Sequence, residues 1–187
     1  MEPALIVLGR FQPFHNGHVA MINGAFSFLG LDDSDMPLRI CIGSSQAEQT
    51  LQNPWSAEER EQMIRVWLDR IDAEIVHVPD LGDPQNYVRH AEKFHGPPGI
   101  IFTTDEGASE LYREADWFVV ESELVNREDW QGWRIRATMQ MLSTVMEEEA
   151  AIAALSINMP ESVARLIIDN GWQRRLLHLG TGGEPVG

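Results

Sequence analysis

ALIVLGRFQPFHNGH, residues 4–18, joins a short apolar run to ten residues that are rich in polar and turn-forming side chains. The run at 4–8 is continuously apolar and ends before Gly9, a pattern typical of a buried parallel strand. From about Gly17 the apolar residues fall on one helical face, with Asn16 as the expected N-cap. The stretch therefore predicts a strand, a tight turn and a helix.

The polar residues of this turn suit an anion. A helix that begins near Gly17 directs its unpaired amides and the positive end of its dipole toward the strand tip. His15 and His18 flank that end, Arg10 comes from the strand side, and Gly17 lets the backbone approach a bulky group closely. We interpret the arrangement as a phosphate-binding cup that lacks a protein nucleophile.

Two other interpretations of the turn have less support. The pair His15 and His18 could belong to a metal site, but no cysteine or carboxylate accompanies it at a useful spacing. An isolated histidine pair is more often structural, and only the strand–turn–helix context favours anion binding. The chain has no Gly-x-x-x-x-Gly-Lys loop, which excludes a P-loop protein.

Further along, strands and helices are expected to alternate. Apolar runs at 38–42, 75–78, 100–103 and 117–120 predict four more strands, and the spacing between them predicts helices. Ser56 and Glu59 match a capping box, and the helix that they open carries Met63, Ile64, Trp67, Leu68 and Ile71 on its inner face. A weaker helical pattern covers 85–95, and residues 106–114 are expected to be helical between the last two strands.

This alternation predicts an α/β fold: a doubly wound, Rossmann-like parallel sheet of about five strands, with helices on both faces and a helical C-terminal part. Ligands bind such sheets at the carboxyl ends of the strands, where the opening stretch would lie. We expect one domain over residues 1–179, a helical C-terminal subregion from about residue 134, and a flexible tail at 180–187. The late helices carry the apolar stripe Ile135, Met139, Leu142 and Val145, and a helix with Pro160 in its first turn.

Composition limits the classes of partner. The 187 residues include 29 acidic and 14 basic side chains, a net charge of −15 that argues against a protein tracking nucleic-acid phosphates. A nucleotide ligand remains compatible, because a few arginines can dominate one cleft. No apolar run is long enough for a membrane helix, and no secretory signal is expected. Cys41, the single cysteine, fits a buried position in a cytoplasmic protein.

Several motifs together resemble a known family. The stretch GRFQPFHNGH at 9–18 resembles the signature of the HxGH nucleotidylyltransferase superfamily and, more narrowly, that of archaeal-type nicotinamide mononucleotide (NMN) adenylyltransferases. Segments 42–46 and 50–60 are similar to the family's second block. Segments 78–81 and 86–88 resemble its third block, with Tyr87 where tryptophan is usual. MPESV at 159–163 resembles the start of its C-terminal helix.

The resemblance implies adenylyl transfer, in which the phosphate of NMN attacks the α-phosphorus of ATP and yields NAD and pyrophosphate, with Mg²⁺ bound to ATP. His18 would contact the reacting α-phosphate, His15 and Arg10 would contact the leaving pyrophosphate, and Arg136 would hold the ATP phosphates. A change of charge on the histidine pair implies falling activity near a pKa of about 6.5. The remaining residues implied for ATP and phosphate are Gly9, Phe11, Gln12, Gly17, Gly132 and Arg134.

On the acceptor side, the resemblance implies that Trp55 and Tyr87 stack on the pyridinium ring. Arg60 would reach the mononucleotide phosphate, and Asp80 would accept from a ribose hydroxyl or an amide. Ser44 and Asn53 complete the acceptor set. The alternatives stay open: both aromatic residues suit a protein core, and both charged residues suit a surface.

The sequence departs from the family pattern at two places. Gln131 and Trp133 replace the hydroxyl residues of a Ser-Gly-Thr segment, and the segment ending in Asp105 stands where Ser-Gly-Asn is usual. The alternative function is therefore a catalytically altered nucleotide-binding relative, or a transferase with another acceptor or nucleoside triphosphate. The expected partners are the small molecules ATP and NMN, without nucleic acid or membrane, and a homo-oligomer is possible.

Overall fold

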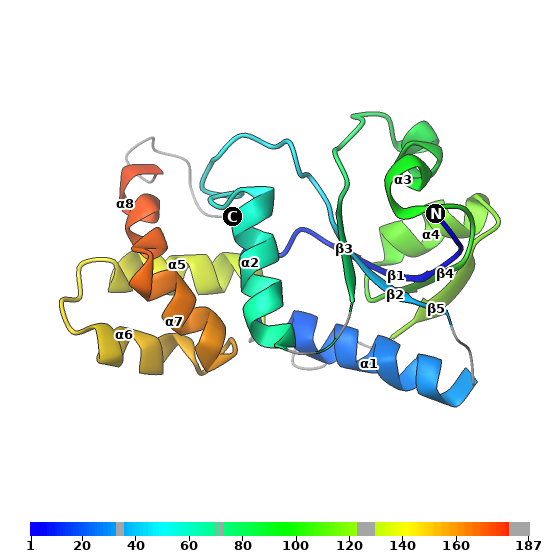
Figure 1. Ribbon diagram of the computed structural model, residues 1–187. Coiled ribbons are helices and arrows are strands. Elements are labelled where there is room, and N and C mark those ends of the chain that lie inside the picture. Colours follow the sequence, from blue (N-terminus) through cyan, green and yellow to red (C-terminus); the bar gives the residue numbers. More distant parts are fainter. Residues whose placement is uncertain (33–35, 70, 72, 123–129, 180–187) are drawn as a thin grey trace. The chain divides into compact units, whose positions relative to one another are not determined.

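A computed structural model describes residues 1–32, 36–69, 71, 73–122 and 130–179. Its centre is a five-stranded sheet in the order β3-β2-β1-β4-β5, in which neighbouring strands are parallel (Figure 1). The strands are β1 (Leu5–Gly9), β2 (Leu38–Ile42), β3 (Glu74–His77), β4 (Ile100–Thr103) and β5 (Phe118–Glu121). The predicted α/β fold with a parallel sheet is confirmed, and the expected strand bounds differ by one residue at most.

The helices also follow the predicted alternation. They are α1 (Asn16–Asp32), α2 (Ala57–Leu68), α3 (Tyr87–His95), α4 (Glu106–Glu114), α5 (Gly132–Leu142), α6 (Glu148–Leu155), α7 (Glu161–Asp169) and α8 (Arg175–Leu179), with 3-10 turns η1 (Pro84–Asn86) and η2 (Trp172–Arg174). The helix expected over 85–95 is divided between η1 and α3, because Asp83 caps the 3-10 turn first. The helical C-terminal part is confirmed.

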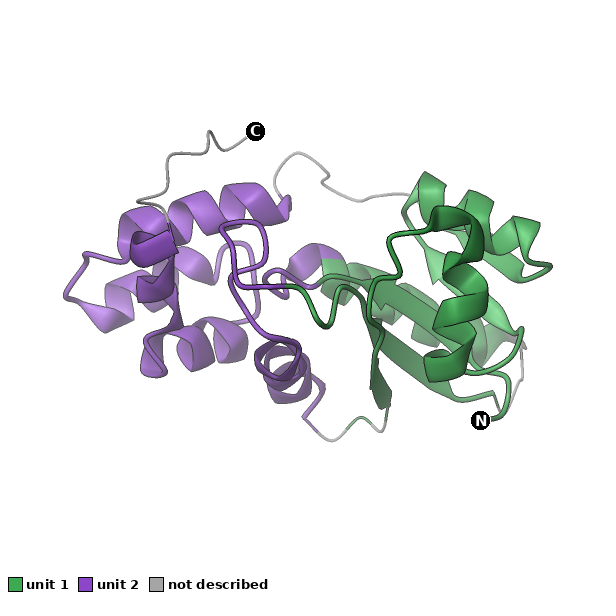
Figure 2. Cartoon of the chain, turned by 90° about the horizontal axis from the view of Figure 1, so that it is seen from above, with its two compact units in different colours: residues 1–10, 18–47, 71–125 green, residues 11–17, 48–70, 126–187 purple. Residues whose placement is uncertain are grey.

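The chain divides into two compact units (Figure 2). Unit 1 comprises residues 1–10, 18–47 and 71–125, and unit 2 comprises residues 11–17, 48–70 and 126–187. Unit 1 holds the sheet with α3, α4 and nearly all of α1, whereas unit 2 holds α2 and the C-terminal helices. The single domain over 1–179 stays a prediction, and the predicted tail at 180–187 lies outside the described residues.

Three details of the sequence analysis were wrong. Helix α2 ends at Leu68, so Ile71 lies beyond it and is 48% exposed rather than on its inner face. Val145 likewise follows the end of α5 and is 40% exposed. Asn16 is the first residue of α1 rather than the residue before it, and its side chain donates to the carbonyl of Ile157. In the described part of the chain, no helix has the length and apolarity needed to cross a membrane.

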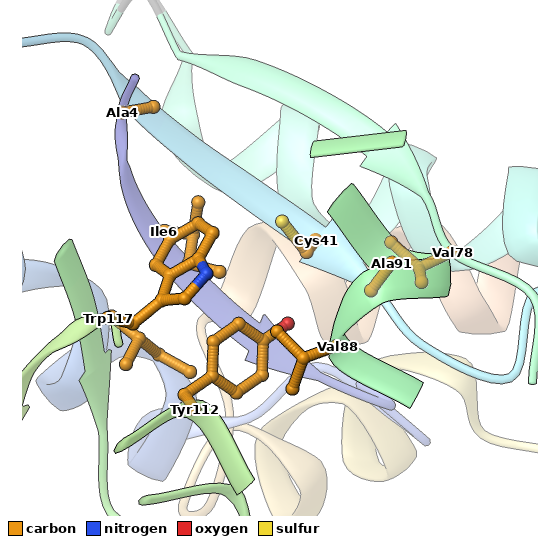
Figure 3. Packing of buried hydrophobic residues seen from close by; sticks show 9 residues of the cluster. Ala4, Ile6, Cys41, Val78, Val88, Ala91, Tyr112 and Trp117 are labelled. Carbon is orange, nitrogen blue, oxygen red and sulfur yellow. The ribbon is translucent and has the colours of Figure 1, made fainter. Parts of the chain in front are cut away.

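Side chains from both sides of the sheet fill the core of unit 1. Helix α1 lies on one face, where Gly24 approaches the ring of Phe102, and α3 and α4 lie on the other (Figure 1). On the second face Ile6 and Cys41 pack beneath Tyr112 and Trp117, whose rings meet edge to face at 5.1 Å (Figure 3). The predicted arrangement of helices on both faces is confirmed.

His95 is a buried polar residue in this second layer. Its Nδ1 lies 3.2 Å from the carbonyl oxygen of Gly96, and its Nε2 lies 2.8 Å from the hydroxyl of Tyr112. A carbonyl only accepts, so Nδ1 carries the hydrogen and Nε2 accepts from Tyr112. Burial lowers the pKa of His95 to about 4, and the imidazole is neutral at pH 7.

Stability should therefore fall in mild acid. The folded pKa of His95 lies below the unfolded value of about 6.5, so protonation favours the unfolded chain as the pH falls from about 6.5 toward 4. Protonation of His95 should lower the free energy of unfolding by about 2 kcal/mol between pH 7 and pH 5. Urea unfolding at both pH values should show that His95→Gln loses less unfolding free energy on acidification than the wild type does. Equal losses would contradict a buried, neutral His95.

Gly99 allows β1 and the start of β4 to approach each other. A Cβ atom there would lie 2.4 Å from the carbonyl oxygen of Ala4, which is a backbone atom and has little freedom to move. Gly99→Ala should therefore destabilise the protein by about 2 kcal/mol or more and lower Tm in calorimetry.

Gly107→Ala is the matched control for this substitution. Gly107 is exposed in α4, and its Cβ would meet only Asp105 Oδ1, at the ordinary distance of 3.4 Å. Higher helix propensity should leave Tm equal or raised. Equal Tm values for the two variants would show that β1 tolerates the extra methyl group.

Candidate active site

Gln12 fixes the histidine loop, residues 11–17, inside unit 2. Its side-chain Nε2 donates to the carbonyl of Trp55 at 2.8 Å, and its Oε1 accepts from the backbone N–H of Trp55 at 3.2 Å. The side chain is buried, so both bonds are shielded from water. The amide group of Gln12 thus positions the loop, and the place of Gln12 in the phosphate-binding set stays a prediction.

Helix α5 contacts the same residue, Gln12. Arg136 donates from Nη1 to the backbone carbonyl of Gln12 at 2.6 Å. Gly132, at the start of the helix, permits this approach, because a Cβ atom there would lie 3.0 Å from the Gln12 carbonyl oxygen and 3.2 Å from Arg136 Nη1. The structure thus brings together three predicted site residues that are far apart in the sequence.

Phe11 has an unusual backbone in this loop. Its φ of 51° lies in the left-handed region, which is unfavourable for an aromatic residue. The ring is buried, lies 6.1 Å from that of Phe14, and Phe14 lies 5.2 Å from Trp67. Packing therefore holds a strained loop in place.

His15 is held at the start of α1. Its Nδ1 accepts from the backbone N–H of Gly17 at 3.1 Å, so the neutral ring carries its hydrogen on Nε2. Burial first, and the positive charge of Arg136 second, lower the pKa of His15 to about 4. The ring is a neutral donor at pH 7, and the expectation that it changes charge near pH 6.5 was wrong.

The contact between His15 and Gly17 requires a small residue. A Cβ atom on Gly17 would lie 2.9 Å from His15 Cε1 and 3.4 Å from the Cβ of Trp130. The backbone N–H of Asn16 donates to the carbonyl of Asn158, before α7, at 2.9 Å. His18, on the first turn of α1, is half-buried and belongs to unit 1.

The loop before α2 contains two buried polar atoms with open hydrogen-bonding capacity. Among the described residues, neither Trp55 Nε1 nor Asn53 Oδ1 has a hydrogen-bond partner. One is a donor and the other an acceptor, and buried groups of this kind are usually satisfied by water or ligand. The Trp55 side chain is 1% exposed, so its ring faces are covered in this structure.

Arg60 follows the confirmed capping box of Ser56 and Glu59. It is only 1% exposed, and its Nε donates to the carbonyl of Ser56 at 3.1 Å. The alternative that Arg60 is a surface ion was wrong. Arg60 is therefore a buried arginine of unit 2, whereas Arg134 in the same unit is exposed.

The two residues that depart from the family pattern contact each other. Trp133 donates from Nε1 to Gln131 Oε1 at 2.6 Å, and the guanidinium carbon of Arg134 lies 5.2 Å from the centre of the Trp133 ring. Trp133 is 39% exposed. Gln131 and Trp133 therefore form a small surface cluster with Arg134 at the start of α5.

In unit 1, the carboxyl ends of the strands carry the remaining predicted residues. Gly9 ends β1 and accepts from the N–H of Gly43 at 2.9 Å. Arg10 follows and is exposed. Ser44 has a φ of 48°, a strained conformation for serine at the end of β2.

Asp80 and Tyr87 lie beyond β3 and line one pocket. The backbone of Asp80 is clamped by Gln46, whose Nε2 donates to the Asp80 carbonyl and whose Oε1 accepts from its N–H, both at 2.8 Å. Burial first, and the Asp80 charge second, raise the pKa of Tyr87 to about 12. The pocket measures about 450 Å³ and is lined by Asp80, Leu81, Gly82, Asp83, Pro84, Tyr87 and Leu111.

A second pocket, of about 250 Å³, follows β4 and includes Thr103, Thr104 and Asp105. Asp105 is the N-cap of α4: its Oδ1 accepts from the N–H of Ala108 at 2.7 Å, while its own N–H donates to Thr103 Oγ1 at 3.1 Å. Asp105 therefore has a local structural use that explains a carboxylate at this turn.

Sequence reasoning missed two residues that shape these regions. Arg175 donates to the carbonyl of Pro54 at 2.8 Å and forms a two-pronged ion pair with Glu59 at 2.6 and 2.7 Å. No local pattern marks it, because its partners lie more than a hundred residues away. Asp83 could have been noticed, since an aspartate before Pro84 is a turn signal.

Comparison with known proteins identifies the family. A family model described as cytidylyltransferase-like matches residues 6–158. The nicotinamide-nucleotide adenylyltransferase of Ignicoccus hospitalis is 34% identical over 176 residues, covering 91% of this chain and 94% of that protein. The chain belongs to this family. The enzyme of the same name from Thermoplasma volcanium, another similar member of the nicotinamide-nucleotide adenylyltransferases, is 30% identical and covers 99% of this chain and 97% of its own length.

A solved structure confirms the fold expected for the nicotinamide-nucleotide adenylyltransferase family. A bifunctional NMN adenylyltransferase/ADP ribose pyrophosphatase from Francisella tularensis superposes with a TM-score of 0.66 at 20% identity. The match covers 97% of this chain but only 54% of the bifunctional protein, so this chain spans about half of that protein's length.

The state of His15 can be measured directly. NMR titration should give the His15 ring a midpoint near pH 4, with resonances assigned through His15→Asn. Arg136→Met should raise this pKa but leave it below 6.5, because burial has the larger effect. A wild-type midpoint near 6.5 would contradict the buried, neutral ring.

Proposed function

We propose that this chain transfers the adenylyl group of ATP to NMN and forms NAD and pyrophosphate. The observation that best supports this chemistry is the state of His15. Its ring is neutral, accepts from the Gly17 N–H through Nδ1, and is influenced by the positive charge of Arg136. Its Nε2–H donates a hydrogen bond at physiological pH without first losing or gaining a proton. Such fixed donors stabilise charge that develops on phosphoryl oxygens.

The reaction needs no nucleophile from the protein. An oxygen of the NMN phosphate forms a bond to the α-phosphorus of ATP, and the bond from that phosphorus to the bridging oxygen breaks. The electron pair leaves with pyrophosphate. The attacking phosphate is already anionic, so the protein contributes alignment and charge stabilisation.

The phosphate-binding residues would divide this work. His18 would donate to the α-phosphate, while His15, Arg10 and Arg136 would stabilise the leaving pyrophosphate. The amides at the start of α1 would add donors that do not titrate. The proposal retains Gly9, Phe11, Gln12, Gly17, Gly132 and Arg134 in the ATP-binding set, with Gln12 as a positioning residue.

For the acceptor, Tyr87 would stack on the pyridinium ring, and Asp80 would accept from a ribose hydroxyl or from the carboxamide of NMN. Trp55 and Asn53 would use the buried donor and acceptor that lack partners among the described residues. Arg60 would reach the acceptor phosphate, and Ser44 would contact the acceptor from the end of β2.

We propose that Mg²⁺ enters as part of the ATP substrate. Over the described residues, no three His, Cys, Asp or Glu side chains come together as a metal-binding group. The donors that Mg²⁺ prefers are oxygens, and the phosphates of ATP supply them. A cytoplasmic location, the absence of nucleic-acid and membrane partners and a homo-oligomeric state stay predictions.

The test is formation of NAD from ATP, Mg²⁺ and NMN, followed by chromatography. His18→Ala should lower kcat/KM on the order of a hundredfold, as loss of one phosphoryl donor does. His178→Ala, which removes an exposed histidine from α8, is the matched control and should retain full activity. Stabilisation by ATP without any product would instead identify a nucleotide-binding relative that has lost catalysis.

A further inference from the structure

Residues 53–56, which we call the α2 loop, have their backbone held at every position. The carbonyl of Asn53 accepts from the N–H of Thr50 at 3.2 Å, and the N–H of Asn53 donates to the Thr50 carbonyl at 3.1 Å. The side chain of Gln12 binds both backbone groups of Trp55. A loop whose backbone is held in this way presents its side chains in fixed positions.

The remaining two residues of the α2 loop are held from the C-terminal part of the chain. Arg175, the first residue of α8, donates from Nη1 to the carbonyl of Pro54 at 2.8 Å. Its guanidinium also pairs with both carboxylate oxygens of Glu59, at 2.6 and 2.7 Å. Glu59 in turn accepts from the N–H of Ser56 at 2.9 Å. Arg175 thus supports Pro54 directly and Ser56 through Glu59.

Two side chains of the α2 loop carry buried polar atoms that suit a ligand. Trp55 Nε1 is a donor and Asn53 Oδ1 is an acceptor, and neither has a partner among the described residues. They can bind one ligand at low entropic cost only if the loop that carries them is already ordered. Pro54 lies between them in the sequence, and its carbonyl is the one that Arg175 holds.

We infer that Arg175 is a positioning residue for the acceptor, because it holds the α2 loop in the conformation in which Asn53 and Trp55 bind NMN. The inference rests on the proposed function, since it takes these two side chains to contact the acceptor. Arg175 acts through the loop and not by touching a substrate. Loss of Arg175 should therefore raise KM for NMN and leave kcat nearly unchanged, the result of losing binding that ground state and transition state share.

The experiment measures kcat and the KM values for NMN and ATP at a temperature well below Tm. Arg175→Met keeps a long side chain but removes the contacts with Pro54 and Glu59. It should raise KM for NMN on the order of tenfold, the cost of ordering two side chains on binding, with little change in KM for ATP. Arg175→Lys can form only part of these contacts and should lie between Arg175→Met and the wild type.

Arg165→Met is the matched control. Arg165, in α7 of the same unit, pairs with the carboxylates of Glu149 and Glu161 at 3.0 and 3.1 Å, and both partners lie outside the α2 loop. The variant therefore removes an arginine with two carboxylate contacts and should leave KM for NMN unchanged.

A second measurement requires no turnover. The indole N–H of Trp55 is buried, so its hydrogen exchange reports how often the α2 loop opens. NMR, with the resonance assigned through Trp55→Phe, should show faster exchange in Arg175→Met than in the wild type. Exchange in Arg165→Met should be unchanged.

The outcomes separate the inference from the proposed function. Absence of product with the wild type would overturn the proposed function. Product with an unchanged KM for NMN in both Arg175 variants would overturn only the inference. The inference also fails if Arg175→Met raises both KM values by the same factor or if Arg165→Met has the same effect, because either result indicates a general loss of structure. If Arg175→Met does not fold, the same criteria apply to Arg175→Lys.

Discussion

The organisation of unit 2 depends on the amide group of Gln12. This side chain binds the backbone of Trp55 through both its donor and its acceptor, while its own carbonyl receives the guanidinium of Arg136. Three segments are thereby fixed relative to one another: the histidine loop, the loop before α2 and the start of α5. Within this arrangement, burial first and the nearby charge of Arg136 second lower the pKa of His15 and keep its ring neutral.

The sequence was sufficient to predict the features that depend on local periodicity. The buried strand before Gly9, the capping box at Ser56 and the helix over 106–114 each follow from residues within one short window. Contacts between distant segments could not be found in this way. The contact between the Gln12 amide and the Trp55 backbone is one of these, because nothing near Gln12 in the sequence identifies Trp55 as its partner. The burial of these side chains could not be predicted from the sequence either. Burial makes His15 neutral and shows that Arg60 is not a surface ion.

The two departures from the family pattern have different physical explanations. Asp105 is used locally, since its carboxylate caps α4 and satisfies an otherwise unpaired amide. Gln131 and Trp133 form a hydrogen-bonded pair with Arg134 over the indole ring. Neither departure requires the residue to take over the role of the one it replaces. The first-turn amides of α5 and Arg136 are present beside these substitutions.

The histidine loop is organised by residues that the ribosome makes much later. The side chain of Gln12 contacts a residue 43 positions later, and its carbonyl accepts from Arg136, 124 positions later. The side chain of Asn16 donates to a carbonyl 141 positions later. Each of these contacts closes a long stretch of intervening chain, and this closure costs more entropy than a local contact does. Loss of a single residue far along the chain therefore removes a contact that orders the histidine loop.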